Sequence, residues 1–112
     1  MKIVKEKIGL SELTDMAAAM FGDMVKAVVD INKEIMAVDA ALHSDEEALL
    51  LQEGSKQDDI WGINIYPELP PEERVEFDSM INLRPRVGNR TRGVDNAEIQ
   101  SKIISVVNSL IE

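Results

Sequence analysis

The stretch MVKAVVDINKEIMAVDAAL, residues 24–42, decides the fold. It contains two runs rich in Val, Ile and Ala on either side of Asn32-Lys33, which is typical of two strands joined by a two-residue turn. Pairing Ile31 with Glu34 across that turn fixes the register of the whole hairpin. One face then collects six apolar side chains: Val25, Ala27 and Val29 from the first strand, and Ala40, Val38 and Met36 from the second. The sequence therefore predicts a β-hairpin with a single apolar face.

One helix is predicted before this hairpin and one after it. The first covers residues 11–21, with Ser11 as its N-cap and Gly22 after its last turn. The second begins in the segment SDEE, where Ser44 and Glu47 have the spacing of a capping box, and it continues to Gly54. The acidic residues of this second helix start also suit the positive end of a helix dipole.

The rest of the chain predicts three more strands and a C-terminal helix. Short alternating or apolar runs indicate strands at residues 2–8, 59–66 and 74–83. The connection at 67–73 contains three prolines and is predicted to be irregular. A second capping box, formed by Asp95 and Glu98, opens a helix that runs to the end of the chain.

The predicted order is β-α-β-β-α-β-β-α, and the predicted fold class is α+β in a single domain of residues 1–112. We expect a mostly antiparallel sheet with the helices packed on its apolar face. The chain has no cysteine, its N-terminal residues lack the pattern of a signal peptide, and it has no apolar run of membrane-spanning length. We therefore expect a cytoplasmic protein without membrane contact. A tendency to form a homo-oligomer is suggested only by its many short aliphatic stretches.

One loop stands out by its charge. The segment RPRVGNRTR, residues 84–92, holds four arginines and no acid, while the remaining eight basic residues are outnumbered by 21 acidic ones. Such a loop attracts an anion or an acidic surface, and arginine favours planar carboxylate or phosphate partners. The net charge of −9 argues against nucleic acid as a partner. The candidate ligand-binding residues are Arg84, Arg86, Asn89, Arg90 and Arg92.

The arginine loop also has a structural interpretation. It leads into the predicted C-terminal helix, whose free N–H groups favour an anion, and Gly88-Asn89 could adopt a positive-φ turn that gathers further N–H groups. Alternatively, Asp95 occupies the helix end itself, and the arginines pair with acids of this chain or of a neighbouring subunit. Both alternatives remain open at this level.

A second candidate site lies on the polar face of the predicted fifth strand. Glu76 and Asp78 alternate there, and Asn64 joins them if the fourth and fifth strands pair. On the polar face of the hairpin, the predicted register places Lys26 opposite Asp39. With His43, the only histidine, Glu76 and Asp78 could serve as acid, base or metal ligands in a small hydrolase or phosphotransfer enzyme. No spacing matches a defined metal motif, and no cofactor is predicted. The alternative is an ordinary half-exposed sheet.

Two long strings carry a resemblance to a known family. These are ALHSDEEALLLQEGSKQDDIWGINIYPE at residues 41–68 and EFDSMINLRPRVGNRTRGVDNAEI at residues 76–99. The chain resembles, over most of its length, a family of short prokaryotic proteins of unknown function. The resemblance implies a fold but no established activity, so it implies no catalytic residues. We therefore expect a binding or interaction module for an anionic ligand or acidic partner, with the small enzyme as the alternative.

Overall fold

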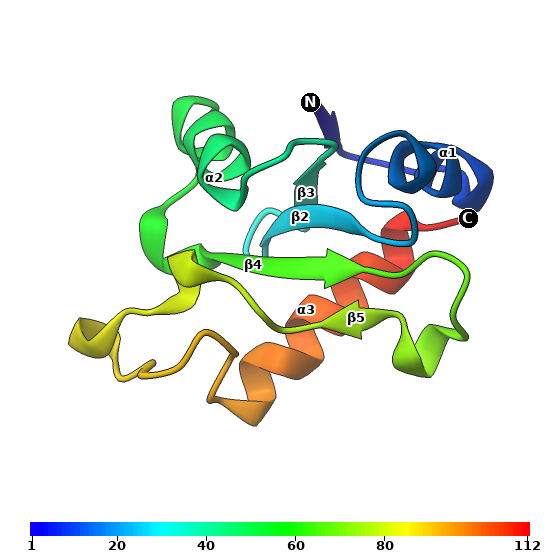
Figure 1. The fold of residues 1–112 in the computed structure, drawn as a ribbon. Helices are drawn as coiled ribbons and strands as arrows, with labels where there is room; N and C mark the ends of the chain where they lie inside the picture. Colours follow the sequence, from blue (N-terminus) through cyan, green and yellow to red (C-terminus); the bar gives the residue numbers. More distant parts are fainter.

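The protein is built around one five-stranded antiparallel sheet, and the computed structural model describes residues 1–112 (Figure 1). The strand order is β1-β3-β2-β4-β5, which places β2 at the centre. The strands are β1 (Lys2–Val4), β2 (Val25–Asp30), β3 (Ile35–Val38), β4 (Ile60–Ile65) and β5 (Val75–Glu76). The helices are α1 (Leu10–Met20), α2 (His43–Gln52) and α3 (Ala97–Leu110). This confirms the predicted α+β class and the predicted order of elements.

The register of the β2–β3 hairpin is the predicted one. Val29 lies opposite Met36, and Ala27 lies opposite Val38. The turn is wider than predicted, because the ladder stops at Asp30 and Glu34 takes a positive φ of 58°. Asp39 also has a positive φ, of 68°, and β3 ends before it. The predicted Lys26–Asp39 pair is therefore wrong. Lys26 instead lies opposite Asn64 of β4.

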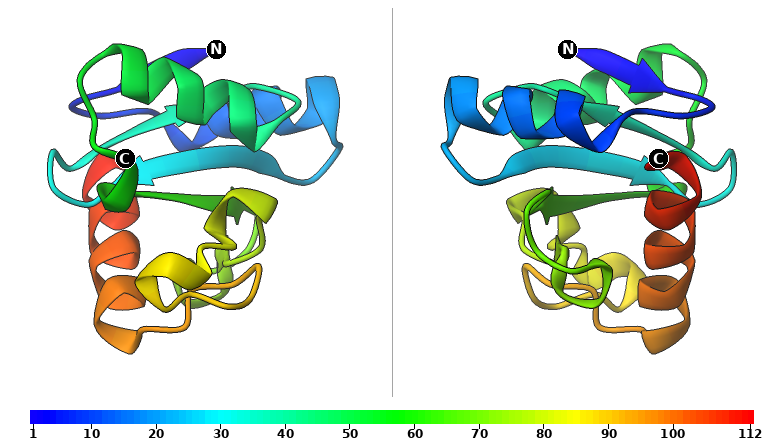
Figure 2. Two further views of the ribbon diagram at one scale, coloured as in Figure 1. Left: turned by 90° about the vertical axis from the view of Figure 1, so that its left-hand side faces the viewer. Right: turned by 90° about the vertical axis from the view of Figure 1, so that its right-hand side faces the viewer.

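The helices cover both faces of the sheet, whereas the sequence predicted that all of them share the apolar face. α1 and α3 contribute Leu13, Ala17, Ile103 and Val107 to the main core, which contains the predicted apolar face of the hairpin. In Figures 1 and 2, α2 lies above β2, while α3 extends below it. α2 packs on the opposite face. There Leu50 meets a smaller cluster: Val28, Ala37 and Ile60. The physical reason is that β2 and β3 carry apolar residues on both faces, so a second layer is needed to keep Val28 and Ala37 from water.

Two predicted helix starts are wrong and the third is displaced by one residue. α1 follows Gly9 and α2 follows Leu42, and neither has a side-chain cap. Ser44 therefore lies inside the first turn of α2 and forms no capping box. At α3 the cap is Asn96, whose Oδ1 accepts the N–H groups of Glu98 and Ile99.

The Asn96 cap gives a direct test of this helix start. We expect Asn96→Ala to lower the free energy of unfolding by about 1 kcal/mol, because two N–H groups of the first turn lose their acceptor. The matched control is Asn108→Ala, an exposed asparagine within the same helix. It should be neutral or slightly stabilising, because alanine has the higher helix propensity. Urea denaturation of both variants makes the comparison, and equal losses would contradict the assigned cap.

β5 has two residues rather than the ten predicted for that strand. Beyond Glu76, side chains satisfy the outer edge of β4. The Asn82 carboxamide exchanges hydrogen bonds with the backbone N–H and C=O of Gly62, both at 2.9 Å. One residue pair further along the edge, the Arg84 guanidinium donates to the carbonyl of Ile60 at 2.5 Å. The edge of β4 is thus completed by two side chains, and the predicted strand is replaced there by two short 3₁₀ turns, Met80–Asn82 and Pro85–Val87.

Candidate functional site

Arg84 is the buried arginine of the 84–92 loop. Its guanidinium donates to the carbonyls of Gln57, Ile60 and Ile81, at 2.8, 2.5 and 3.1 Å. Its Cζ lies 4.3 Å from the ring centroid of Trp61, which is a cation–π contact. Burial lowers the pKa of Arg84 from its ordinary value, and the nearby acids Glu47 and Asp58 oppose that effect. Arg84 thus ties the loop to the start of β4.

Asn89 organises the same loop from inside. Its Nδ2 donates to the carbonyls of Asn82 and Gly93 at 2.7 and 2.9 Å, and its Oδ1 accepts the N–H of Asp95. The backbones of Arg84 and Asn89 also form an antiparallel bridge. The predicted positive-φ turn is present at Gly88, with φ of 86°. The side chain of Asn89 is therefore occupied by the loop itself.

The N–H groups of the loop have an internal acceptor. Asp95 accepts the N–H of Arg90 at 2.7 Å and the hydroxyl of Thr91 at 2.5 Å. These two hydrogen bonds, with that from Thr91 the stronger influence, lower the pKa of Asp95. Asp95 thus binds the loop rather than capping α3, while Asn96 caps the helix. This is close to the structural alternative raised by the sequence.

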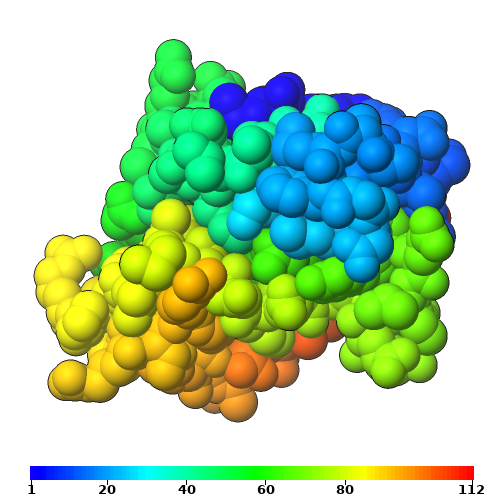
Figure 3. All heavy atoms as spheres, in the orientation of Figure 1, coloured from blue at the N-terminus to red at the C-terminus, as the bar shows by residue number.

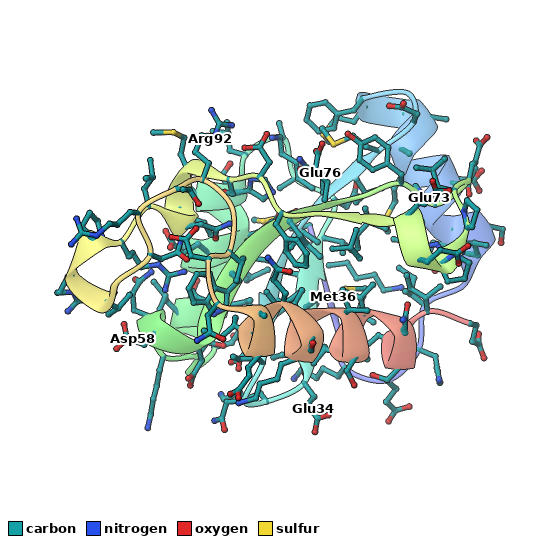
Figure 4. The ribbon with its side chains drawn as sticks, turned by 90° about the horizontal axis from the view of Figure 1, so that it is seen from below. Glu34, Met36, Asp58, Glu73, Glu76 and Arg92 are labelled. Atoms are coloured by element: carbon teal, nitrogen blue, oxygen red, sulfur yellow. The ribbon has the colours of Figure 1, made fainter.

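The other three arginines are exposed, and only two of them have an acidic partner. Arg86 lies 3.5 Å from Asp58, and both side chains are largely exposed. Arg92 donates from Nε to Asp78 at 2.8 Å, and its other guanidinium nitrogens bond no atom of the chain. The side chain of Arg90 has no partner in the chain. Figure 4 shows Arg92 and Asp58 on different parts of the surface, so the exposed arginines do not form one cluster.

The three residues of the alternative enzyme site are only partly brought together. His43 is buried at the start of α2. Glu76 accepts hydrogen bonds from Asn64 and Tyr66, at 2.8 and 3.1 Å, which agrees with the expected pairing of the fourth and fifth strands. Asp78 is bound to Arg92. No group of three or more His, Asp or Glu side chains is arranged to hold a metal ion.

A small cavity of about 180 Å³ joins the arginine loop to the start of α2. Two cations, a histidine and two hydroxyl groups line it, and no acidic side chain does. The full set is Lys26, Leu42, His43, Ser44, Ser79, Met80, Ile81 and Arg92. In Figure 3 the segments around residues 42–44, 79–81 and 92 adjoin on the visible face. We call this cavity the α2 pocket.

The two larger cavities have the opposite charge. One, of about 340 Å³, lies beside the N-terminus of α3 and has Asp95 as its only charged lining residue. The other, of about 310 Å³, is lined by Asp23 and Glu68 together with Tyr66 and Leu69. Because neither has a basic lining residue, the α2 pocket is the cavity whose charge suits an anion.

His43 is held as a neutral imidazole in the α2 pocket. Its Nε2 lies 2.7 Å from the carbonyl oxygen of Ile63, and because a carbonyl only accepts, Nε2 must carry the proton. Burial lowers the pKa of His43, and the charges of Lys26 and Arg92 lower it further, against the opposing effects of the Ile63 bond and Asp78. Its Nδ1 is then free as a hydrogen-bond acceptor at neutral pH.

The start of α2 and Lys26 add positive potential to the pocket. No side chain caps α2, so the helix dipole is not neutralised by a cap, although Asp45 in the first turn offsets part of that potential and its own N–H donates to the carbonyl of Leu42. Lys26 forms no salt bridge within the chain, and its Nζ lies over the ring of Phe21, 5.4 Å from the centroid. Its cation is thus uncompensated by any direct carboxylate contact.

Sequence reasoning identified Arg92 and His43, placed Lys26 on the polar face of the hairpin, and missed Ser44 and Ser79 as neighbours. Lys26 was assigned to a pair with Asp39, and Ser44 to a helix cap. The bond of His43 to Ile63 and the pairing of Lys26 with Asn64 both depend on β2 lying beside β4. No local pattern in the sequence signals that arrangement, because the two strands are separated by β3 and α2.

None of the helices combines the length and apolar composition that crossing a membrane requires. No curated protein and no solved structure matches the chain. A family model described as "Protein of unknown function (DUF5674)" matches residues 2–110, nearly the whole chain. This agrees with the resemblance carried by residues 41–68 and 76–99. The chain therefore belongs to the DUF5674 family of proteins of unknown function.

Proposed function

We propose that this protein is a binding module for small anions, and that a phosphate or carboxylate group is held in the α2 pocket between Lys26 and Arg92. The observation that carries the proposal is the charge of the lining: Lys26 and Arg92 line the pocket, no acidic residue does, and the one neighbouring carboxylate, Asp78, takes only Nε of Arg92, in a chain of net charge −9. On so acidic a surface, a cavity without a carboxylate is a local positive site that concentrates anions.

The donors of the pocket suit an anion. The guanidinium of Arg92 keeps free N–H groups while Nε holds Asp78, and the N-terminus of α2 adds its dipole. Ser44 supplies an exposed hydroxyl. Within the arginine loop this assigns Arg92 to the ligand, gives Arg84 and Asn89 the role of holding the loop, and leaves Arg86 and Arg90 outside the pocket.

Binding is favoured over turnover by the state of the candidate acid and base groups. A hydrolase that used His43 with Glu76 and Asp78 needs all three near one reacting atom. Only His43 lines the pocket, while Glu76 is bonded to Asn64 and Tyr66. Self-association and a cytoplasmic location stay predictions.

The test is titration calorimetry with inorganic phosphate at low and moderate salt. We expect binding that weakens as salt rises and that falls by about tenfold or more in Arg92→Gln, because hydrogen bonds to a charged group are worth about 1.5–3 kcal/mol. Lys26→Met should weaken binding similarly. The matched control is Arg90→Gln, which removes the same charge from the same loop but lies outside the pocket.

Two outcomes would overturn the proposal. One is the absence of any heat of binding with phosphate or with simple carboxylates at low salt. The other is an equal loss of affinity in Arg92→Gln and Arg90→Gln, because that pattern reports the overall charge of the protein and not a site. Release of phosphate from an aryl phosphate by the wild type, lost in His43→Gln, would favour the enzyme instead.

A further inference from the structure

The mouth of the α2 pocket is apolar. Leu42 and Met80 both line the cavity, yet they remain 56% and 62% exposed, so they stand at its rim. Apart from the terminal Met1, no large apolar side chain of the chain is as exposed as these two. The ring of Phe21, 38% exposed, does not line the cavity, but its centroid lies 5.4 Å from Nζ of Lys26, which does. Exposed apolar groups gathered around a polar pocket are a feature of ligand sites.

The size of the pocket limits what fits inside it. Water occupies about 30 Å³ per molecule in the liquid, so 180 Å³ is the space of about six water-sized groups. A phosphate or carboxylate group with its first attached atoms fills that space. Any larger substituent has to leave through the mouth, where it meets Leu42 and Met80.

Resting on the anion site proposed above, we propose that the ligand is an amphipathic organic anion. Its phosphate or carboxylate group lies between Lys26 and Arg92, and an attached apolar group of a few carbons packs on Leu42 and Met80. A protein partner is a poorer occupant, because a stable interface takes about 20–30 residues from each side, whereas this rim offers a few side chains.

The first experiment compares butyl phosphate with inorganic phosphate by titration calorimetry on the wild type, with pentanoate against acetate as a second pair. Each methylene that leaves water is worth about fourfold in affinity. A butyl group covered on one side by the rim should therefore gain about tenfold over the bare anion. Comparing the two pairs separates the contribution of the phosphate head from that of the carboxylate head.

The second experiment tests whether the apolar contact can be weakened while the binding of the anionic group stays unchanged. Met80→Ala should lower the affinity for butyl phosphate by about threefold or more and leave the affinity for inorganic phosphate unchanged, because it removes apolar contact and no charge. The matched control is Leu83→Ala, an exposed apolar residue three positions later that does not line the pocket. It should change neither affinity.

The outcomes separate the two proposals. If phosphate binds in an Arg92-dependent way but butyl phosphate gains nothing, the apolar rim is not part of the site and this inference fails, while the anion site stands. The inference also fails if Leu83→Ala lowers the affinity for butyl phosphate as much as Met80→Ala does. If neither anion binds, both proposals fail together.

Discussion

Arg84→Ala should lower the free energy of unfolding by about 3–5 kcal/mol. The guanidinium donates to the carbonyls of Gln57, Ile60 and Ile81. Truncation removes all three hydrogen bonds and leaves the buried edge carbonyl of Ile60 without its side-chain donor, while Gln57 keeps the N–H of Ile60. An unsatisfied buried acceptor costs about 1–3 kcal/mol. The lost contact with Trp61 adds about 1 kcal/mol, and release of a buried charge offsets part of the total.

One further variant separates the geometry of the side chain from its charge at position 84, and a second, at position 86, is the control. Arg84→Lys keeps the charge but not the planar set of donors, so it should lose most of the same stability. Arg86→Ala removes an exposed arginine two residues away, at 3.5 Å from Asp58, and should cost less than about 0.5 kcal/mol. Urea denaturation of all three variants makes the measurement. A loss for Arg84→Ala no larger than that for Arg86→Ala would exclude the structural role given to Arg84.

Glu46→Gln should remove a large part of the pH dependence of stability. Glu46 is a fully buried residue of α2, and its Oε2 accepts the N–H of Ala40 at 3.1 Å while Oε1 has no partner. Burial raises the pKa of Glu46 from 4.5 to about 9, although the bond from Ala40 acts in the opposite direction. The carboxyl group is therefore protonated and neutral in the folded protein at pH 7.

The sign follows from proton binding in the two states. Between the ordinary pKa of 4.5 and the folded pKa of about 9, the folded protein holds a proton that the unfolded chain releases. Stability therefore falls as pH rises through that window, and the part that depends on protonated Glu46 is gone above the folded pKa. At about 1.4 kcal/mol for each pH unit, the loss between about pH 5 and about pH 8 is on the order of 4 kcal/mol.

The measurement is urea denaturation of the wild type and Glu46→Gln at several pH values across that range. Glutamine keeps the acceptor for Ala40 and cannot ionise, so the variant should gain on the wild type steadily as pH rises. Glu12→Gln, at an exposed position of α1, is the control and should show no such trend. Parallel curves for wild type and Glu46→Gln would contradict the buried, neutral state of this carboxyl group.

Predictions from local sequence patterns were confirmed where the same residues also pack in the core. The register of the β2–β3 hairpin follows from the alternation of its apolar residues, because a shift of one residue would turn every core side chain to the other face. The capping boxes failed at Ser44 and Asp95 for a different reason. Several residues near a helix start can accept an N–H, and the packing of the flanking chain selects among them. Asn96 was selected at α3, while α2 begins without a side-chain cap.

The sequence by itself determined the α+β class, the order of the elements and the hairpin register, because these depend on hydrophobic periodicity over neighbouring residues. Only the tertiary structure decided that α2 covers the second face, that β4 lies beside β2, and that Asn82 and Arg84 complete the edge of β4. The bonds of Asn82 and Arg84 to the edge of β4 join residues 20 and 24 positions apart. It also decided where the charges of these residues lie: Arg84 is used internally, whereas Lys26, which has no salt bridge, and Arg92, which is paired with Asp78, meet at the α2 pocket. The hydrogen-bond partner of a side chain is set by what the fold brings within about 3 Å of it, and sequence spacing does not carry that information.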